Sequence, residues 1–209
     1  MSKRHVGLVM MVIGILAWAV GLGLGGYNLW DNYRAGMQAD IILDTFVGHQ
    51  EEATATEPNK TPEPPPELPP DLNRELPVLE VDGYRYIGTI SIPEINVALP
   101  VLEDWSPMLL KTSPCRYMGS PYQGDLIICA HNYATHFGRL KNLLSGDEVI
   151  FTDVEGNEFR YTVVELETLA GTAVEEMESG AWDLTLFTCT LGGQTRVTVR
   201  CNLLENDEA

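Results

Sequence analysis

Hydrophobic and polar positions divide this 209-residue chain into three consecutive parts. The first is an apolar run, because no charged residue occurs between Val6 and Leu29. The second, from Ala39 to Asp82, is rich in acidic residues and proline. In the third, which follows Asp82, short segments of β-branched and aromatic residues alternate with turn residues, a pattern typical of β-strands. The pattern therefore predicts a membrane-spanning helix, a spacer and a β-rich domain.

The apolar run is long enough for a helix to cross a hydrocarbon core about 30 Å thick, whereas the apolar region of a signal peptide is shorter. Lys3 and Arg4 precede the run, and Asp31 balances Arg34 after it. Because positive residues stay on the cytoplasmic side, we expect the N-terminus inside the cell and everything after Tyr27 outside. Several glycines near the end of the run weaken the helix and leave cleavage as an alternative to anchoring.

The acidic, proline-rich part has the composition of an extended spacer. Only Lys60 and Arg74 oppose its many acidic side chains, and prolines recur along it. Like charges repel one another and proline favours extended backbone, so we expect a stalk that holds the following domain off the membrane. The net charge of −17 also argues against a nucleic-acid-binding surface, which would be basic.

Seven segments after Asp82 have the composition of strands, with turn residues between them. Many short strands within about 120 residues imply a closed or nearly closed barrel, because an open sheet would leave its edges exposed. Short helices are expected at 106–111 and 140–144. The predicted strands cover residues 84–92, 98–102, 125–130, 148–152, 158–165, 184–190 and 195–202.

The strongest local signal is a hairpin near the C-terminus. β-branched and aromatic residues flank Gly192 and Gly193, and a glycine pair between two strands is typical of a tight turn. Counting outward from the glycines pairs Cys189 with Arg196, with Cβ atoms roughly 5 Å apart. A fixed positive charge favours thiolate over thiol and can hold a developing oxyanion. Arg200 shares this strand face but lies too far from Cys189 for contact, so the pattern indicates Cys189 and Arg196 as half of a cysteine active site.

A cysteine active site also needs a base, and four histidines compete for that role. His5 and His49 lie outside the segments expected to pack. His131 ends the apolar run 124–131, which is typical of a buried central strand, so it would be held rigidly and still reach the surface. His136 follows in a loop-like segment, where its position would be less fixed. We therefore predict His131 as the base.

Taken in order, these motifs resemble those of sortases, the membrane-anchored cysteine transpeptidases of Gram-positive bacteria. The resemblance implies a mainly β fold, a closed eight-stranded β-barrel with short helices, preceded by one N-terminal transmembrane helix. It covers about 83–204. The matching motifs are Thr-Leu-Phe-Thr-Cys at 185–189 with an arginine shortly after, Ala-His-Asn-Tyr at 130–133, the opening strands at 86–101, His-Phe-Gly-Arg-Leu at 136–140 and Gly-Asp-Glu-Val at 146–149.

The resemblance also implies a function and a role for each candidate residue. Cys189 would attack a C-terminal sorting signal to give a thioacyl enzyme, His131 would act as general acid and base, and Arg196 would stabilise the oxyanion. Substrates would be sorting-signal-bearing surface proteins or pilins, and the acceptor an amine of a lipid-linked peptidoglycan precursor or of a pilin. No cofactor is needed. Two alternatives stay open: a cysteine peptidase that hydrolyses the same kind of motif, and a non-catalytic membrane-tethered binding barrel.

These parts combine into a single-pass protein of the cell membrane, with a cytoplasmic N-terminus and an extracellular catalytic domain. The expected organisation is a cytoplasmic tail at 1–5, a transmembrane anchor at 6–29, a stalk at 30–82, the catalytic barrel at 83–204 and a tail at 205–209.

Metal binding and disulfide formation are alternatives for some of the remaining polar groups. The acidic cluster Glu175, Glu176 and Glu178 lacks the alternating oxygen ligands of a calcium loop, so a solvated face is expected there. An even number of cysteines outside the cell permits two disulfides, but we favour buried free thiols for Cys115, Cys129 and Cys201. Two cysteines and two histidines could together bind zinc in a tetrahedral site: Cys129, His131, His136 and Cys189. Their spacing in the sequence, however, matches no common zinc-binding pattern.

Overall fold

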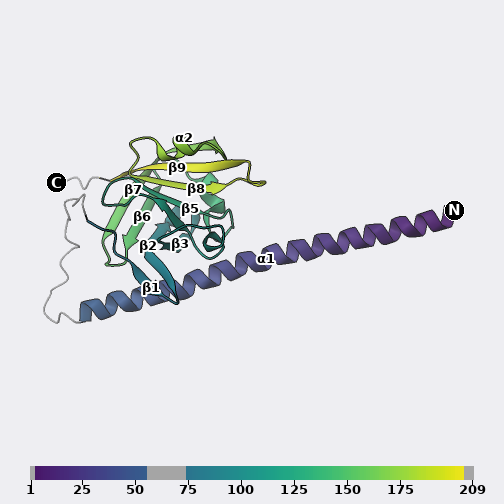
Figure 1. The fold of residues 1–209 in the computed structure, drawn as a ribbon, viewed down its shortest axis with the longest axis horizontal. Helices are drawn as coiled ribbons and strands as arrows, with labels where there is room; N and C mark the ends of the chain where they lie inside the picture. The colour runs from purple at the N-terminus through teal and green to yellow at the C-terminus, as the bar shows by residue number, and fades with distance from the viewer. Residues whose placement is uncertain (1–2, 56–73, 205–209) are drawn as a thin grey trace. The chain divides into compact units, whose positions relative to one another are not determined.

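The computed structural model describes residues 3–55 and 74–204, which form one long N-terminal helix and a β-rich domain. Helix α1 (Lys3–Ala55) is continuous over 53 residues (Figure 1). Within it, the 18 residues Met10–Tyr27 have a mean hydropathy of 1.8, which makes this segment long and apolar enough to cross a membrane. The span predicted at 6–29 therefore lies within a helix.

Helix α1 continues beyond the apolar run, into a segment where an extended stalk was expected. The extended conformation was predicted from Ala39 onward, but the helix ends at Ala55. Apolar residues lie between the acidic ones in this segment, and the first proline after it is Pro58, so nothing removes the helical hydrogen bonds before that point. Residues 56–73, which hold most of the prolines, lie outside the described residues, and their extended conformation stays a prediction.

The domain from residue 74 onward is a sheet that closes on itself. Nine strands follow the order β1-β2-β3-β4-β5-β8-β9-β7-β6, and pairing of β2 with β6 completes the ring (Figure 1). Short strand β1 pairs only with the beginning of β2, so strands β2 to β9 form an eight-stranded barrel. The β3–β4 and β5–β8 pairs are parallel and the others antiparallel. The predicted closed, mainly β, eight-stranded barrel is confirmed.

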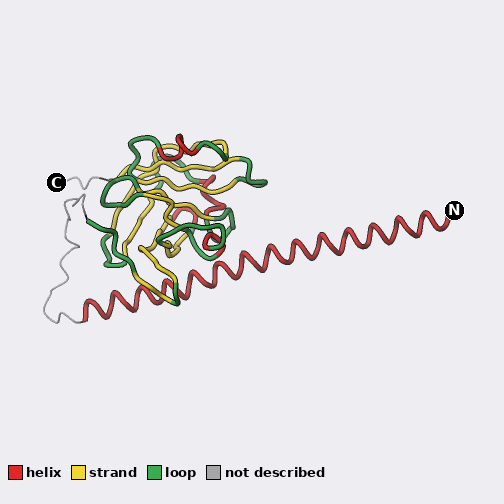
Figure 2. Tube along the Cα trace, viewed as in Figure 1, coloured by secondary structure: helices red, strands yellow, loops and turns green. Residues whose placement is uncertain are grey.

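All seven predicted strands are present, and two more, β1 and β4, were not predicted. Figure 2 shows that strands dominate this domain and that its helices are short. The strands are β1 (Leu79–Val81), β2 (Tyr84–Ile92), β3 (Val97–Leu102), β4 (Cys115–Met118), β5 (Leu126–Ala130), β6 (Glu148–Asp153), β7 (Glu158–Ala170), β8 (Leu184–Cys189) and β9 (Thr195–Leu203). The helices are η1 (Pro93–Ile95), η2 (Leu109–Lys111), η3 (Phe137–Asn142) and α2 (Val174–Glu178).

The core lies inside the barrel, and the central strand β5 is buried at every position. This agrees with its unbroken apolar sequence, because a strand covered on both faces has no polar side to present. Gly88 allows β2 to close against β6. A Cβ atom at this position would lie 2.1 Å from the carbonyl oxygen of Thr152, so any larger residue would force the two strands apart.

The β8–β9 hairpin has the predicted register. Cys189 pairs with Arg196. The pairing continues toward the turn, where the Thr190 amide donates to the carbonyl of Thr195 at 3.0 Å. Gly192 and Gly193 have φ angles of 88° and 72°, values that favour glycine and give the turn the twist of the flanking strands. The turn chemistry therefore fixes which residue faces the cysteine.

Candidate active site

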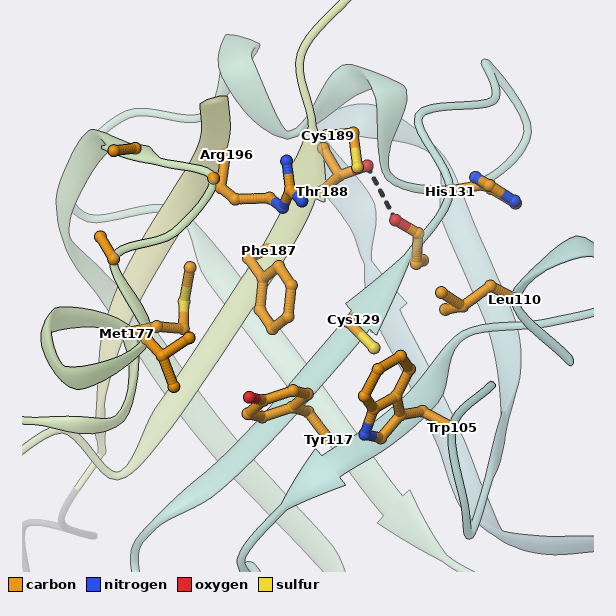
Figure 3. Close-up of a pocket in the computed structure, with 15 residues that line it drawn as sticks. Trp105, Leu110, Tyr117, Cys129, His131, Met177, Phe187, Thr188, Cys189 and Arg196 are labelled. Atoms are coloured by element: carbon orange, nitrogen blue, oxygen red, sulfur yellow. Dashed lines mark hydrogen bonds between the residues drawn. The ribbon is translucent and has the colours of Figure 1, made fainter. Parts of the chain in front are cut away.

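A cavity of about 260 Å³ opens where β5 and β8 end. All three residues that the sequence predicts to be catalytic line this cavity, and the rest of its lining is mainly apolar (Figure 3). Its lining residues include Trp105, Tyr117, His131, Val174, Met177, Phe187, Thr188, Cys189 and Arg196.

Cys189 and Arg196 lie next to each other at this cavity. Cys189 is the last residue of β8, and its partner Arg196 stands near the beginning of β9; both are half-buried. The Nη1 atom of Arg196 donates to the carbonyls of Gly193 at 2.9 Å and Thr195 at 3.0 Å, so the turn itself orients the guanidinium. The arrangement places oriented N–H donors and a positive charge beside the thiol.

His131 reaches the same end of the barrel on a different strand. In the parallel β5–β8 ladder, Ala130 pairs with Thr188, so His131 and Cys189 each lie one residue beyond that pair. The His131 ring packs 4.8 Å from the ring of Tyr133, and in Figure 3 it is turned away from Cys189. Catalytic hydrogen bonds often form only in the substrate complex. Proton transfer would therefore require the imidazole to rotate toward the thiol.

A side-chain hydrogen bond joins the two strand ends that carry these groups. Thr188 is buried, and its hydroxyl donates to the carbonyl oxygen of Ala130 at 2.8 Å (dashed line in Figure 3). This bond runs between the neighbouring strands β8 and β5. It ties the residue before Cys189 to the residue before His131, so the spacing of thiol and imidazole does not rest on the backbone ladder alone.

The other three cysteines are free thiols with little tendency to ionise. Cys115, Cys129 and Cys201 are buried, and no disulfide joins any of the four cysteines. Burial raises the pKa of Cys129 and of Cys201 to about 12, and it raises the pKa of Cys115 still further from its ordinary value. Because the thiolate is the reactive form, these side chains are inert near neutral pH. Cys189 differs from these three cysteines because it is only half-buried and lines the cavity.

His136 does not occupy the loosely fixed position that the sequence suggested. It immediately precedes η3 and is completely buried, and its ring lies 5.4 Å from that of Tyr133. The imidazole packs into the domain because Phe137 and Leu140 of η3, which follow it, are themselves core residues. His136 does not line the cavity, whereas His131 does.

The alternative metal sites find no support in the arrangement of side chains. Within residues 3–55 and 74–204, no group of three or more histidine, cysteine, aspartate or glutamate side chains is placed to hold a metal ion. In the acidic cluster, Glu178 accepts a hydrogen bond from the Tyr117 hydroxyl at 3.0 Å, and Glu175 and Glu176 are exposed. Neither the four-residue zinc set nor the acidic cluster forms a cage of ligands.

The family model for the sortase domain matches residues 90–204, more than half of the chain and almost the whole barrel. This protein belongs to the sortase family. Members of the family are cysteine transpeptidases, which agrees with a thiol, an imidazole and a guanidinium around one cavity.

Individual sortases are similar over much of their length. Sortase A of Bacillus anthracis is 27% identical over 204 residues, which cover 90% of this chain and 89% of that protein. The crystal structure of sortase C1 from Streptococcus agalactiae superposes with a TM-score of 0.54 and 25% identity, over 79% of this chain and 91% of that one. Sortase C1 of GBS Pilus Island 1 gives a TM-score of 0.51 at 22% identity, over 59% of this chain and 66%, just under two thirds, of that chain. The similarities extend to both A and C sortases, so they leave the subclass of this sortase open.

Several residues of the sortase cavity were not identified from the sequence. Trp105, Tyr117 and Phe187 form a row of aromatic rings along one wall, with ring centroids 5.6 Å and 5.5 Å apart. They come from the β3–β4 loop, β4 and β8. The sequence carries no local signal that would group them, because only the barrel brings these three segments together.

Proposed function

We propose that this sortase cleaves a C-terminal sorting signal through a thioacyl intermediate on Cys189 and transfers the protein to an amine of the cell wall or of a pilin. The observation that carries the proposal is the pairing of Cys189 with Arg196 at a cavity that His131 also lines. An apolar wall beside these groups offers an extended peptide a surface to bind, and the thiol, imidazole and guanidinium line the same cavity.

Each group has a defined role in the proposed reaction. The Cys189 thiolate forms a bond to the carbonyl carbon of the scissile peptide bond, while Arg196 donates hydrogen bonds to the oxygen as negative charge gathers there. The C–N bond then breaks, and protonated His131 gives its proton to the leaving amine. An acceptor amine attacks the thioacyl carbon, passes a proton to His131 and releases Cys189.

Product analysis separates this function from its alternatives. The full-length protein in detergent is incubated with a sorting-signal peptide, with and without an added amine acceptor, and the products are identified by mass spectrometry. A transpeptidase gives the amine adduct when acceptor is present. A cysteine peptidase gives the hydrolysed acid under both conditions, and a binding barrel leaves the peptide intact, so either of these results would contradict the proposal.

Lysine in place of Arg196 is expected to lower kcat/KM about 10²–10³-fold, the usual effect of removing one oxyanion donor. Lysine keeps the charge but loses the planar fork that the carbonyls of Gly193 and Thr195 hold in position. The loss should fall mainly on kcat, because the oxyanion exists only in the transition state. Steady-state kinetics on the purified variant measures both parameters.

The matched control for this variant is Arg160→Lys. Arg160 is an exposed side chain on β7 that pairs with Glu148 at 2.7 Å and Glu158 at 2.6 Å, and exposed ion pairs contribute little. Its replacement should leave kcat/KM within about twofold. Equal kcat/KM values for Arg196→Lys and the wild-type protein would contradict the proposal that Arg196 stabilises the oxyanion. Arg200 is unsuitable as a control because it is buried.

We also propose that α1 anchors the protein in the cell membrane with the barrel outside. The segment Met10–Tyr27 is apolar enough to span, and Lys3 and Arg4 precede it, which favours a cytoplasmic N-terminus. Tethering places the sortase and a lipid-linked acceptor on one membrane surface and so raises their effective concentration.

Trypsin applied to intact, wall-stripped cells tests this topology. Trypsin cleaves after lysine and arginine, and between Ala39 and Asp82 the only such residues are Lys60 and Arg74. Arg74 packs 4.9 Å over the ring of Tyr122. We therefore expect cleavage after Lys60 and release of a soluble barrel fragment, measured by immunoblot and mass. The Lys60→Gln variant should not release that fragment. Protection of the segment in intact cells, with the N-terminus cleaved instead, would contradict the proposed orientation.

The contacts of Arg74 also bear on where the catalytic domain begins. The sequence prediction started the barrel at 83, but β1 at Leu79–Val81 already pairs with β2. Arg74 forms an ion pair with Glu155, in the β6–β7 turn. We propose 74–204 as the extent of the folded domain, with 30–73 as the link to the anchor.

A further inference from the structure

The second wall of the cavity is the short helix α2 (Val174–Glu178), which lies opposite the aromatic row of Trp105, Tyr117 and Phe187. Val174 and Met177 line the cavity from this helix. Met177 is labelled in Figure 3. A helix of five residues cannot hold its own shape, because nucleation costs more than so few hydrogen bonds return. The position of this wall must therefore be set by contacts outside the helix.

Arg200 of β9 supplies the first of these contacts through hydrogen bonds to the helix backbone. It lies on β9 with only 3% of its surface exposed. Its Nη1 donates to the carbonyl of Met177 at 2.9 Å, and its Nη2 donates to the carbonyl of Glu176 at 2.6 Å. The last carbonyls of a helix lack partners within the helix, and a positive charge there is favourable. Arg200 thus satisfies and fixes the C-terminal turn of α2.

Arg200 is itself held in a single orientation. Its Nε donates to the carboxylate of Glu167 on β7 at 2.7 Å, and its Nη1 also donates to the hydroxyl of Thr185 on β8 at 3.0 Å. A buried arginine is tolerated only when its charge and its N–H groups are paired, as they are here. Three strands of the barrel therefore determine where α2 lies.

The second contact is a hydrogen bond between α2 and the aromatic row. The Tyr117 hydroxyl donates to the carboxylate of Glu178, the last residue of α2, at 3.0 Å. The ring of Tyr117 stands between Trp105 and Phe187, so this bond joins the aromatic row directly to the opposite wall. The pKa of Tyr117 is raised from its ordinary value by burial and by the bond to Glu178, so the hydroxyl remains a donor at neutral pH.

We propose that Tyr117 and Arg200 are positioning residues that set the width of the cavity between α2 and the aromatic row, and through it the size of the apolar side chain that the sortase accepts from its peptide. This inference rests on the proposed function, because it assumes that the cavity binds the peptide that Cys189 cleaves. The two side chains that α2 contributes to the cavity, Val174 and Met177, are apolar, and Arg200 does not itself line the cavity.

The Tyr117→Phe variant tests the contact between α2 and the aromatic row with the smallest change. It removes one hydroxyl and keeps the ring in the aromatic row. We expect KM for a sorting-signal peptide to rise about two- to tenfold, as for one lost hydrogen bond, with kcat within about twofold. The preference between two peptides that differ by one methylene at the apolar position should weaken. Glu178→Ala should reproduce both effects, and Glu178→Gln, which keeps an acceptor oxygen, should be close to wild type.

Two further variants complete the test. Tyr84→Phe changes an exposed tyrosine that does not line the cavity, and it should leave KM and the size preference unchanged. Arg200→Lys keeps the buried charge but cannot bond both helix carbonyls and Glu167 together, so it should raise KM more than Tyr117→Phe. Its fold is checked by circular dichroism, and if it unfolds, the Tyr117 and Glu178 variants decide the question alone.

The outcomes separate this inference from the proposed function on which it rests. Unchanged KM and unchanged size preference in Tyr117→Phe and Glu178→Ala, with Cys189→Ala inactive, would overturn the positioning role and leave the transpeptidase in place. A loss of kcat alone in Tyr117→Phe would also overturn it, because a residue that only shapes the cavity does not act on the transition state. Turnover by Cys189→Ala would instead overturn the proposed function.

Discussion

Replacing Cys189 with alanine is expected to lower kcat/KM by about 10⁴-fold or more, because no thioacyl intermediate can form without the nucleophile. The variant should fold normally, since Cys189 is half-buried at the cavity and makes no contribution to the packed core. Turnover of a sorting-signal peptide measures the loss. Intact mass after incubation with a thiol-reactive peptide analogue shows an adduct on the wild-type protein and none on the variant.

Cys201→Ala provides the control for this experiment. Cys201 is a core residue, and burial raises its pKa to about 12, so it carries no thiolate near neutral pH. Below that pKa the thiol stays neutral, and alkylation of the folded protein at pH 7 should therefore modify Cys189 and spare Cys201. The control should keep its activity and the peptide adduct. An adduct that persists in Cys189→Ala, or wild-type turnover by that variant, would end the assignment of the nucleophile.

The nucleophile could be predicted from the sequence because its surroundings are local. A glycine pair between two β-branched segments determines the turn, and the turn determines that Cys189 faces Arg196. The strands were predictable for a similar reason, since β-branched and aromatic segments between turn residues mark strands without reference to the rest of the chain. Their number implied a closed or nearly closed barrel, and the resemblance to sortases implied eight strands. Strand β4 was missed because it pairs with β3 through a single residue, Leu102 with Cys115, and carries little pattern of its own.

The wall of the cavity could not be predicted because its contacts are long-range. Arg200 and Glu176 lie 24 residues apart, and Tyr117 and Glu178 lie 61 apart. The hairpin register predicted that Arg200 lies too far from Cys189 for contact, and Arg200 pairs with Thr185. The register gave no indication of what the Arg200 guanidinium binds. The acidic residues of α2 suggested a solvated face, and the structure shows Glu178 also accepting the bond from Tyr117. Local pattern predicts the elements, whereas their polar contacts depend on the closed barrel.

The placement of His131 near Cys189 was only partly predictable from the sequence. The unbroken apolar sequence of β5 predicted a buried strand with His131 at its end, and β5 is buried throughout. The parallel pairing of β5 with β8 was not predictable, and this pairing brings the two strand ends together. A single register shift between these strands would move the imidazole about 3.3 Å along the barrel, enough to prevent direct proton transfer.

Alanine in place of His131 is expected to lower kcat/KM by more than the roughly 10²–10⁴-fold typical of an acid–base group, because formation of the thiolate is affected as well. The wild-type protein should show a bell-shaped dependence of kcat/KM on pH, since activity requires a thiolate and an imidazolium together. In His131→Ala the limb of this profile that belongs to the imidazole should disappear. Steady-state rates across the pH range measure both effects.

His136 is the control, and its effect should fall on stability rather than on chemistry. It is completely buried outside the cavity, so His136→Ala leaves a cavity in the domain and lowers the free energy of unfolding, while the folded fraction keeps the wild-type pH profile. Rates are therefore compared well below the melting temperature of each variant. If His136→Ala lost the imidazole limb and His131→Ala kept it, the base would be the buried histidine, and the β5 strand end would have no part in proton transfer.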